Sequence, residues 1–214
     1  MAGDPLTIAT IMRTAPVIPV LVIEDPSHAE PVAKALVAGG LRVLEVTLRT
    51  AAALEALAAM KRVEGAVVGA GTVLDQAQLD GALAAGAEFI VSPGLTEGLG
   101  RAAIASAVPF LPGIANAGDI MRGLDLGLTH FKFFPAVASG GLPALRALAA
   151  PFGRCRFCPT GGITAETAAQ WLAFDPVLCV GGSWLVPKGP LDLAIVEQAA
   201  RAAAALAVAG SGDR

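Results

Sequence analysis

A single lysine stands inside an apolar run in the second half of the chain, residues 130–136, which reads HFKFFPA. If this run is a strand, its side chains alternate between two faces, so Lys132 and Phe134 share one face. Burial of an ammonium group is costly, and the usual response is loss of a proton, which leaves a neutral amine. A neutral amine can attack a carbonyl carbon to form a Schiff base. A structural lysine, either ion-paired or extended towards solvent, is the alternative that this run alone leaves open.

A second run, residues 43–49 (VLEVTLR), carries two charged side chains. Its apolar residues would face helices, so the alternation of a strand puts Glu45, Thr47 and Arg49 together on the other face. A carboxylate there can move protons, and a guanidinium can bind the carboxylate of a ligand. An ion pair between Glu45 and Arg49 that only neutralises itself is the alternative.

Glycine pairs follow two later apolar runs, in the segments TGG (160–162) and GGS (181–183). Adjacent glycines allow backbone N–H groups to converge on an anion. These two segments are therefore candidate phosphate-binding loops. Simple tight turns are the alternative for either pair.

These runs belong to a regular alternation of short β-branched segments with longer segments rich in alanine and leucine. This alternation is typical of repeated strand–helix units and predicts an α/β fold, a (β/α)8 TIM barrel with a leading N-terminal helix. An open doubly wound sheet would instead place a glycine fingerprint after the first strand, where this chain has Glu24, Asp25 and Pro26. The predicted strands are 17–23, 41–48, 66–73, 88–92, 109–114, 130–134, 156–160 and 177–180. The predicted helices are 4–15, 28–38, 51–61, 76–85, 96–107, 117–126, 141–150, 165–174 and 191–207.

The C-terminal ends of the strands carry the chemistry in a barrel of this kind. Small residues precede Thr72 at the end of the third predicted strand, and Pro93 follows the fourth. We predict a single domain, residues 1–209, followed by a disordered tail, residues 210–214.

Composition excludes several classes of partner. The 214 residues carry a net charge of -3, so nucleic acid is not an expected partner. No apolar run reaches the roughly 20 residues of a membrane-spanning helix, and the first residues do not resemble a secretory signal. We therefore expect a cytoplasmic protein that does not associate with membranes.

The side chains that commonly bind metals are few and scattered. Two histidines, His28 and His130, lie far apart in the sequence, and Cys155 and Cys158 form a CxxC without a partner pair. Structural zinc sites use four such ligands. We predict no metal and no organic cofactor.

Together these groups would suit carbon–carbon bond cleavage at the mouth of a barrel. A lysine amine condenses with a ketone, and the cationic iminium then withdraws electrons from a neighbouring carbon–carbon bond. A phosphosugar isomerase and a noncatalytic barrel that binds a phosphorylated ligand are the alternatives.

Several motifs in order give the chain a resemblance to a known family. It resembles the 2-keto-3-deoxy-6-phosphogluconate (KDPG) aldolases and 4-hydroxy-2-oxoglutarate aldolases, which are class I, Schiff-base enzymes. The segments that carry the resemblance are AKALVAGGLRVLEVTLRT (33–50), VGAGTVL (68–74), SPGLTE (92–97), HFKFFPA (130–136), RFCPTGGI (156–163) and VLCVGGSWL (177–185).

The resemblance implies reversible cleavage of KDPG to pyruvate and D-glyceraldehyde 3-phosphate, and a homotrimer. Cleavage of 4-hydroxy-2-oxoglutarate to pyruvate and glyoxylate is a second implied activity, and the 6-phosphogalactonate epimer is an alternative substrate. Lys132 would be the Schiff-base lysine and Glu45 the general acid and base. The resemblance also implies substrate-binding residues: Arg49 and Thr72 for the pyruvyl carboxylate, Pro93 and Phe134 as pocket lining, and Gly161, Gly162, Gly182 and Ser183 for the phosphate.

Two positions depart from the family pattern. Relatives carry a glutamate where this chain has Val137, and Ser-Thr where it has Ala115 and Asn116. Neither position is among the residues assigned to chemistry. The departures bear on the aldehyde side of the substrate.

Overall fold

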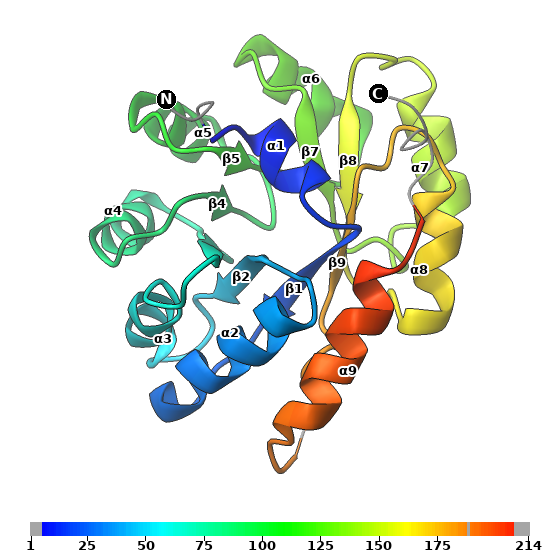
Figure 1. Ribbon diagram of the computed structural model, residues 1–214. Helices are drawn as coiled ribbons and strands as arrows, with labels where there is room; N and C mark the ends of the chain where they lie inside the picture. The colour runs from blue at the N-terminus through cyan, green and yellow to red at the C-terminus, as the bar shows by residue number, and fades with distance from the viewer. Residues whose placement is uncertain (1–5, 188, 208–214) are drawn as a thin grey trace, which may run out of the picture.

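The structure is a computed structural model that describes residues 6–187 and 189–207, with helices arranged around a set of strands (Figure 1). The strands are β1 (Val17–Leu21), β2 (Val43–Thr47), β3 (Val67–Gly71), β4 (Ile90–Val91), β5 (Phe110–Leu111), β6 (Gly113–Ile114), β7 (His130–Phe133), β8 (Arg156–Pro159) and β9 (Val180–Gly182). The helices are α1 (Ile8–Arg13), the short 3-10 helix η1 (Pro26–His28), α2 (Ala29–Ala38), α3 (Ala53–Met60), α4 (Gln76–Ala84), α5 (Glu97–Ala105), α6 (Ala117–Asp125), α7 (Gly141–Ala149), α8 (Ala165–Leu172) and α9 (Leu193–Ala204). The predicted tail, residues 210–214, lies outside the described residues.

All strand pairs are parallel, as the alternation of strands and helices predicted. One sheet has the order β5-β4-β3-β2-β1-β9 and the other has the order β6-β7-β8. Single bridges, Phe157 with Val177 and Thr160 with Gly181, connect β8 to the segment that ends in β9. The fold is therefore α/β with parallel strands. Because the described strands run in the same direction, their C-terminal ends lie on one side of the molecule.

The fifth predicted strand is interrupted in the structure. Pro112 separates β5 from β6, and the pairing partner changes there from β4 to β7. Proline has no N–H to donate to a neighbouring strand, but its carbonyl oxygen still accepts a 2.8 Å hydrogen bond from the backbone N–H of Lys132. The split thus marks the point where one sheet gives way to the other.

The first predicted helix and the eighth predicted strand also differ in extent. Helix α1 covers only Ile8–Arg13 of the predicted 4–15, with residues 1–5 outside the described part of the chain. The eighth predicted strand, 177–180, overlaps β9 only at Val180. Before that residue the chain bonds to Phe157 through the carbonyl oxygen of Pro176 and the N–H of Leu178, and it pairs with β1 only from Val180.

Two clusters of buried side chains fill the molecule. The larger contains residues such as Leu44 and Val46 of β2, which pack with helix residues. The smaller contains side chains from five strands together with Ile11 and Met12 of α1. Successive residues of β2 therefore face opposite clusters, as the alternation of residues 43–49 predicted.

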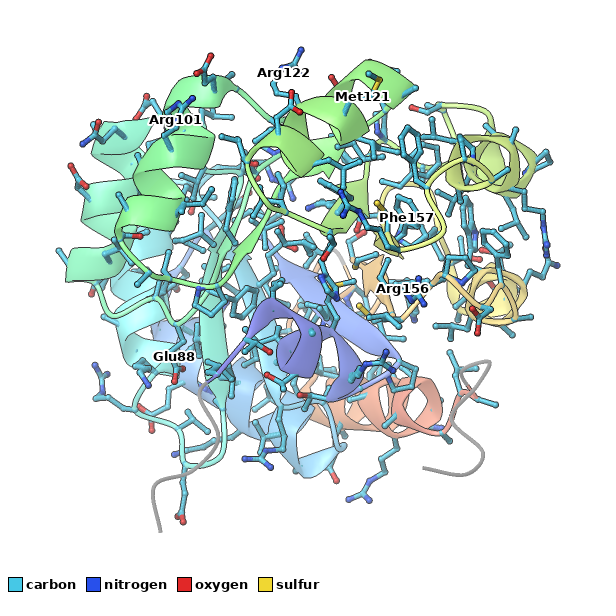
Figure 2. The ribbon with its side chains drawn as sticks, turned by 90° about the horizontal axis from the view of Figure 1, so that it is seen from above. Glu88, Arg101, Met121, Arg122, Arg156 and Phe157 are labelled. Atoms are coloured by element: carbon cyan, nitrogen blue, oxygen red, sulfur yellow. The ribbon has the colours of Figure 1, made fainter. Side chains whose placement is uncertain are left out.

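The outer surface carries charged side chains together with several exposed apolar ones, such as Met121. Figure 2 shows side chains such as Arg101 and Arg122 projecting from the helices towards solvent, and both residues are exposed. Within the described residues, no helix is both long enough and apolar enough to cross a membrane.

Candidate active site

A buried ion pair joins the two residues predicted to carry the chemistry. Nζ of Lys132 in β7 lies 3.0 Å from Oε1 of Glu45 in β2, although 87 positions separate them in the chain. Their side chains are only 6% and 4% exposed. A proton can move between amine and carboxylate over this distance, so the pair can serve both as nucleophile and as acid or base.

This pairing decides between the interpretations of Glu45. The predicted alternative, in which Glu45 only neutralises Arg49 on the same strand, is wrong, because the carboxylate pairs with Lys132. The alternative for Lys132, an ion-paired structural lysine, would have the same geometry as a catalytic pair, so the contact alone does not separate the two. A buried ion pair is seldom a net source of stability, since desolvation of both groups offsets their attraction.

Phe134 follows Lys132 on the same face of the chain. Its ring centroid lies 5.4 Å from Nζ of Lys132, within the range of a cation–π contact. The ring therefore covers the amine on one side. This position next to the reacting atom is compatible with the predicted role of Phe134 as pocket lining.

Arg49 lies just beyond the end of β2, and its guanidinium is hydrogen-bonded to Thr47, a residue to which we assigned no role. Its Nε donates a 3.2 Å hydrogen bond to Oγ1 of Thr47, and that hydroxyl in turn donates to the carbonyl oxygen of Leu21 at 2.8 Å. Thr47 is buried, so it can fix the direction of the exposed guanidinium. The signal in the sequence was its place between Glu45 and Arg49 on one face.

A cavity of about 870 Å³ opens beside Arg49. Residues of β1, of the segment that follows it, and of the segment after β9 line this cavity, and Ser183 is among them. Two residues predicted to hold opposite ends of a substrate, Arg49 and Ser183, thus share one cavity.

Thr72 follows directly after β3, and Pro93 lies two residues beyond the end of β4. Thr72 has a φ of 60°, a left-handed conformation that is unfavourable for a β-branched residue. The carbonyl oxygen of Pro93 lies so close to Gly113 that a Cβ there would be 2.1 Å from it. Because Gly113 pairs with Lys132 in register, Pro93 approaches the strand next to the lysine.

The two predicted glycine pairs lie side by side. A bridge joins Thr160, the residue before the first pair, to Gly181, the first residue of the second pair. Gly161 and Gly162 have φ values of 103° and 79°, which favour glycine, and the carbonyl oxygen of Gly161 accepts a 3.1 Å hydrogen bond from Val137. Gly182 ends β9, and Ser183 follows it with an exposed side chain.

Thr160 is a buried polar residue that the sequence reasoning did not assign. It is 6% exposed, and its hydroxyl lies 3.4 Å from the carbonyl oxygen of Cys158. The register of β7 and β8 pairs Lys132 with Cys158, so Thr160 follows two positions later on the same face. That spacing was the signal for it.

The two cysteines of the CxxC lie in different parts of the core. Cys155 belongs to the larger buried cluster and Cys158 to the smaller, so the two residues of the CxxC face different sides. Burial raises the pKa of the Cys179 thiol well above its usual value, and a hydrogen bond with Cys158 acts in the same direction. Over residues 6–187 and 189–207, no three histidine, cysteine or acidic side chains gather in a way that could hold a metal ion.

Comparison with known proteins places these residues in a family. A family model described as "Aldolase: KDPG and KHG aldolase" matches residues 8–200. The chain belongs to the KDPG and KHG aldolase family. The predicted family resemblance is thereby confirmed.

The relatives are similar over nearly their whole length. A 2-dehydro-3-deoxy-phosphogluconate aldolase of Zymomonas mobilis is 60% identical over 198 residues, which cover 92% of this chain and 95% of that protein. The crystal structure of the aldolase of Z. mobilis ZM4 with 3-phosphoglycerate has a TM-score of 0.93 at 59% identity, covering 94% of this chain and 97% of that one.

A third relative bears on the chemistry. The KDPG aldolase of Legionella pneumophila, solved with pyruvate captured as a covalent carbinolamine intermediate, is 41% identical with a TM-score of 0.90. The alignment covers 93% of this chain and 98% of that one.

Proposed function

We propose that this protein is a class I aldolase that reversibly cleaves KDPG to pyruvate and D-glyceraldehyde 3-phosphate. The observation that carries the proposal is the buried pair of Lys132 and Glu45, whose reacting atoms lie 3.0 Å apart. Membership of the KDPG and KHG aldolase family supports it.

The first half of the mechanism builds a Schiff base. Transfer of a proton from the Lys132 ammonium to Glu45 leaves a neutral amine, which attacks the C2 carbonyl carbon of the substrate. Glu45 then returns that proton to the carbinolamine oxygen and transfers a second one to it from the attacking nitrogen, so that the oxygen leaves as water. The product is an iminium cation at C2.

The second half breaks and repairs bonds around that cation. Removal of the proton of the C4 hydroxyl lets the C3–C4 bond break, so the aldehyde departs and the electron pair of that bond forms an enamine. Protonation of C3 and hydrolysis of the iminium release pyruvate and restore the lysine. Glu45 is the acid and base for these proton transfers, directly or through water.

Substrate binding is proposed at the surrounding strand ends. Arg49 and Thr72 would bind the pyruvyl carboxylate, because a guanidinium and a hydroxyl both donate hydrogen bonds to such an anion. Pro93 and Phe134 would line the pocket. The phosphate would lie against Gly161, Gly162, Gly182 and Ser183, because the backbone N–H groups of adjacent glycines can converge on an anion.

The direct test is release of pyruvate from KDPG by the purified protein, followed with lactate dehydrogenase and NADH. We expect cleavage, and its loss in Lys132→Ala, whereas Lys61→Ala, a change at an exposed lysine, should retain it. No pyruvate from KDPG would contradict the proposal. Ligand affinity without any cleavage would instead favour the noncatalytic binding protein.

Substrate preference is tested in the same assay. Cleavage of 4-hydroxy-2-oxoglutarate is expected as a second activity, because this substrate has the same pyruvyl end as KDPG, although it lacks the phosphate. If the protein cleaves the 6-phosphogalactonate epimer faster than KDPG, the epimer replaces KDPG as the proposed principal substrate.

We also propose a closed (β/α)8 barrel within a single domain, residues 1–209. In support, only Pro112 separates β5 from β6, and two bridges connect β8 with the β9 segment. Trp171 and Trp184 allow a check, since fluorescence and far-UV circular dichroism should then report one common unfolding transition.

For the assembly and its surroundings we propose a cytoplasmic homotrimer that uses no cofactor and binds neither nucleic acid nor membranes. Sedimentation of the purified protein tests the trimer. Full activity after dialysis against EDTA is expected, and lost activity that zinc or magnesium restores would contradict it.

A further inference from the structure

Gly71, the last residue of β3, lies against the carboxylate of Glu45. A Cβ built on Gly71 would lie 2.1 Å from Oε1 of Glu45, 2.6 Å from its Cγ and 2.7 Å from its Cδ. Side chains do not approach a Cβ this closely, so the carboxylate occupies the space that any other residue at position 71 would need.

Backbone conformation does not account for a glycine here. Gly71 is absent from the glycines with positive φ, so its backbone is one that any residue could adopt. The strand around it is also fixed, because Gly71 pairs with Thr47 in register and its carbonyl oxygen accepts a 2.8 Å hydrogen bond from Leu48. The backbone cannot move away from a new methyl group without loss of these contacts.

We infer that Gly71 is a positioning residue, which holds the Glu45 carboxylate against the amine of Lys132 by leaving room for it. The inference rests on the proposed aldolase function for its catalytic part. In Gly71→Ala the methyl group displaces Oε1, which is the atom that lies 3.0 Å from Nζ of Lys132. Proton transfer between the two groups then becomes slower while the substrate-binding groups stay in place.

The same strand provides a matched control. Gly69 is two residues earlier, and it too has no positive φ. A Cβ there would have its nearest contacts, at 2.5 Å, with ring atoms of Phe89, whereas at Gly71 the nearest contacts are with Glu45. Gly69→Ala therefore disturbs buried packing in β3 to a similar degree, but without displacing the carboxylate.

The first experiment is a double-mutant cycle on stability, which needs no enzymatic activity. Gly71→Ala is expected to lower the melting temperature by about 5 °C or more when Glu45 is present. In the Glu45→Ala background the clash is gone, so the same change should have little effect. An equal loss in both backgrounds would overturn the inference, and this outcome is independent of whether the protein is an aldolase.

The second experiment measures turnover of the folded variants with KDPG. We expect Gly71→Ala to lower kcat by roughly 10- to 1,000-fold, within the roughly 10,000-fold that a general acid–base can contribute, with KM changed less than threefold. Gly69→Ala should keep kcat within about threefold of the wild type.

A rescue completes the test. Aspartate is one methylene shorter, so Glu45→Asp in the Gly71→Ala protein should raise kcat above that of Gly71→Ala alone. Equal losses in the two glycine variants, or no rescue by aspartate, would contradict the positioning role. A wild-type protein that cleaves no substrate would count against the proposed function only, since the stability cycle would still decide the steric part.

Discussion

At the scale of single residues, the site depends on a carboxylate and an amine that only the folded chain brings together. Replacement of such a buried pair by apolar residues is often neutral or even stabilising, so stability alone gives little reason for Lys132 and Glu45 to be there. A chemical role accounts for both. It also accounts for the ring of Phe134 over the amine and for the space at Gly71.

Thr72 provides a prediction at this scale. Its left-handed backbone costs roughly 1–3 kcal/mol, which Thr72→Gly should partly recover, giving a protein more stable by about 1 kcal/mol. Loss of a hydroxyl that binds a carboxylate should raise KM for KDPG about tenfold or more. Urea unfolding and steady-state kinetics measure the two effects.

Ala107 is the matched control, because it has a φ of 57° in a turn that contains no predicted site residue. Ala107→Gly should raise stability by a similar amount with no change in KM. A rise in KM for both variants, or for neither, would remove Thr72 from the substrate site.

At the scale of secondary-structure elements, the sequence predicted the order of strands and helices well. Hydrophobic periodicity is a local signal, and each predicted segment overlaps an observed element of the same type. What the sequence could not supply is the choice of pairing partner. The interruption at Pro112 and the late start of β9 both follow from a change of neighbour between two sheets, which involves residues distant in the sequence.

Helix α1 provides the prediction at this scale. Ile11 is fully buried, and it joins the smaller buried cluster with side chains from the strands. Ile11→Ala should therefore lower the free energy of unfolding by about 2–5 kcal/mol, as measured in urea. Ile8, which is only partly buried against the same cluster, should cost clearly less when changed to alanine. Equal, small effects would mean that α1 contributes little to the core.

At the scale of the whole molecule, a half-buried histidine connects stability with pH. His130 begins β7, and burial lowers its pKa below the usual 6.5, with Arg13 and Arg156 acting in the same direction. Arg156, which Figure 2 labels, pairs with His130 in register across β7 and β8. Protonation of His130 therefore favours the unfolded state.

The sign of the effect follows from linkage. The part of the free energy of unfolding that depends on neutral His130 is fully present above pH 6.5. It is lost as the pH falls from 6.5 through the lowered pKa of the folded state, by at most about 1.4 kcal/mol per pH unit. We expect His130→Gln to lose less stability than the wild type between pH 7.5 and 5.5 in urea unfolding. His28→Gln is the control, because His28 is exposed. An unchanged pH dependence in His130→Gln would contradict the assignment.

The candidate site was predictable from the sequence only in part. Alternation along residues 43–49 placed Glu45 on the correct face, and the apolar run around Lys132 marked it as unusual. Neither pattern contains the 3.0 Å contact between them, because the two strands are not neighbours in the sequence or in a sheet. The reason for a glycine at position 71 could not be predicted either, because it depends on the position of the Glu45 side chain, which lies on another strand.

The most direct test of the account is reduction with borohydride in the presence of pyruvate, followed by peptide mapping. A Schiff base at Lys132 predicts irreversible addition of reduced pyruvate to that residue alone, with loss of activity. Lys132→Ala should take up none. Absence of an adduct, or an adduct at another lysine, would contradict the central claim that the amine of Lys132 forms the covalent intermediate.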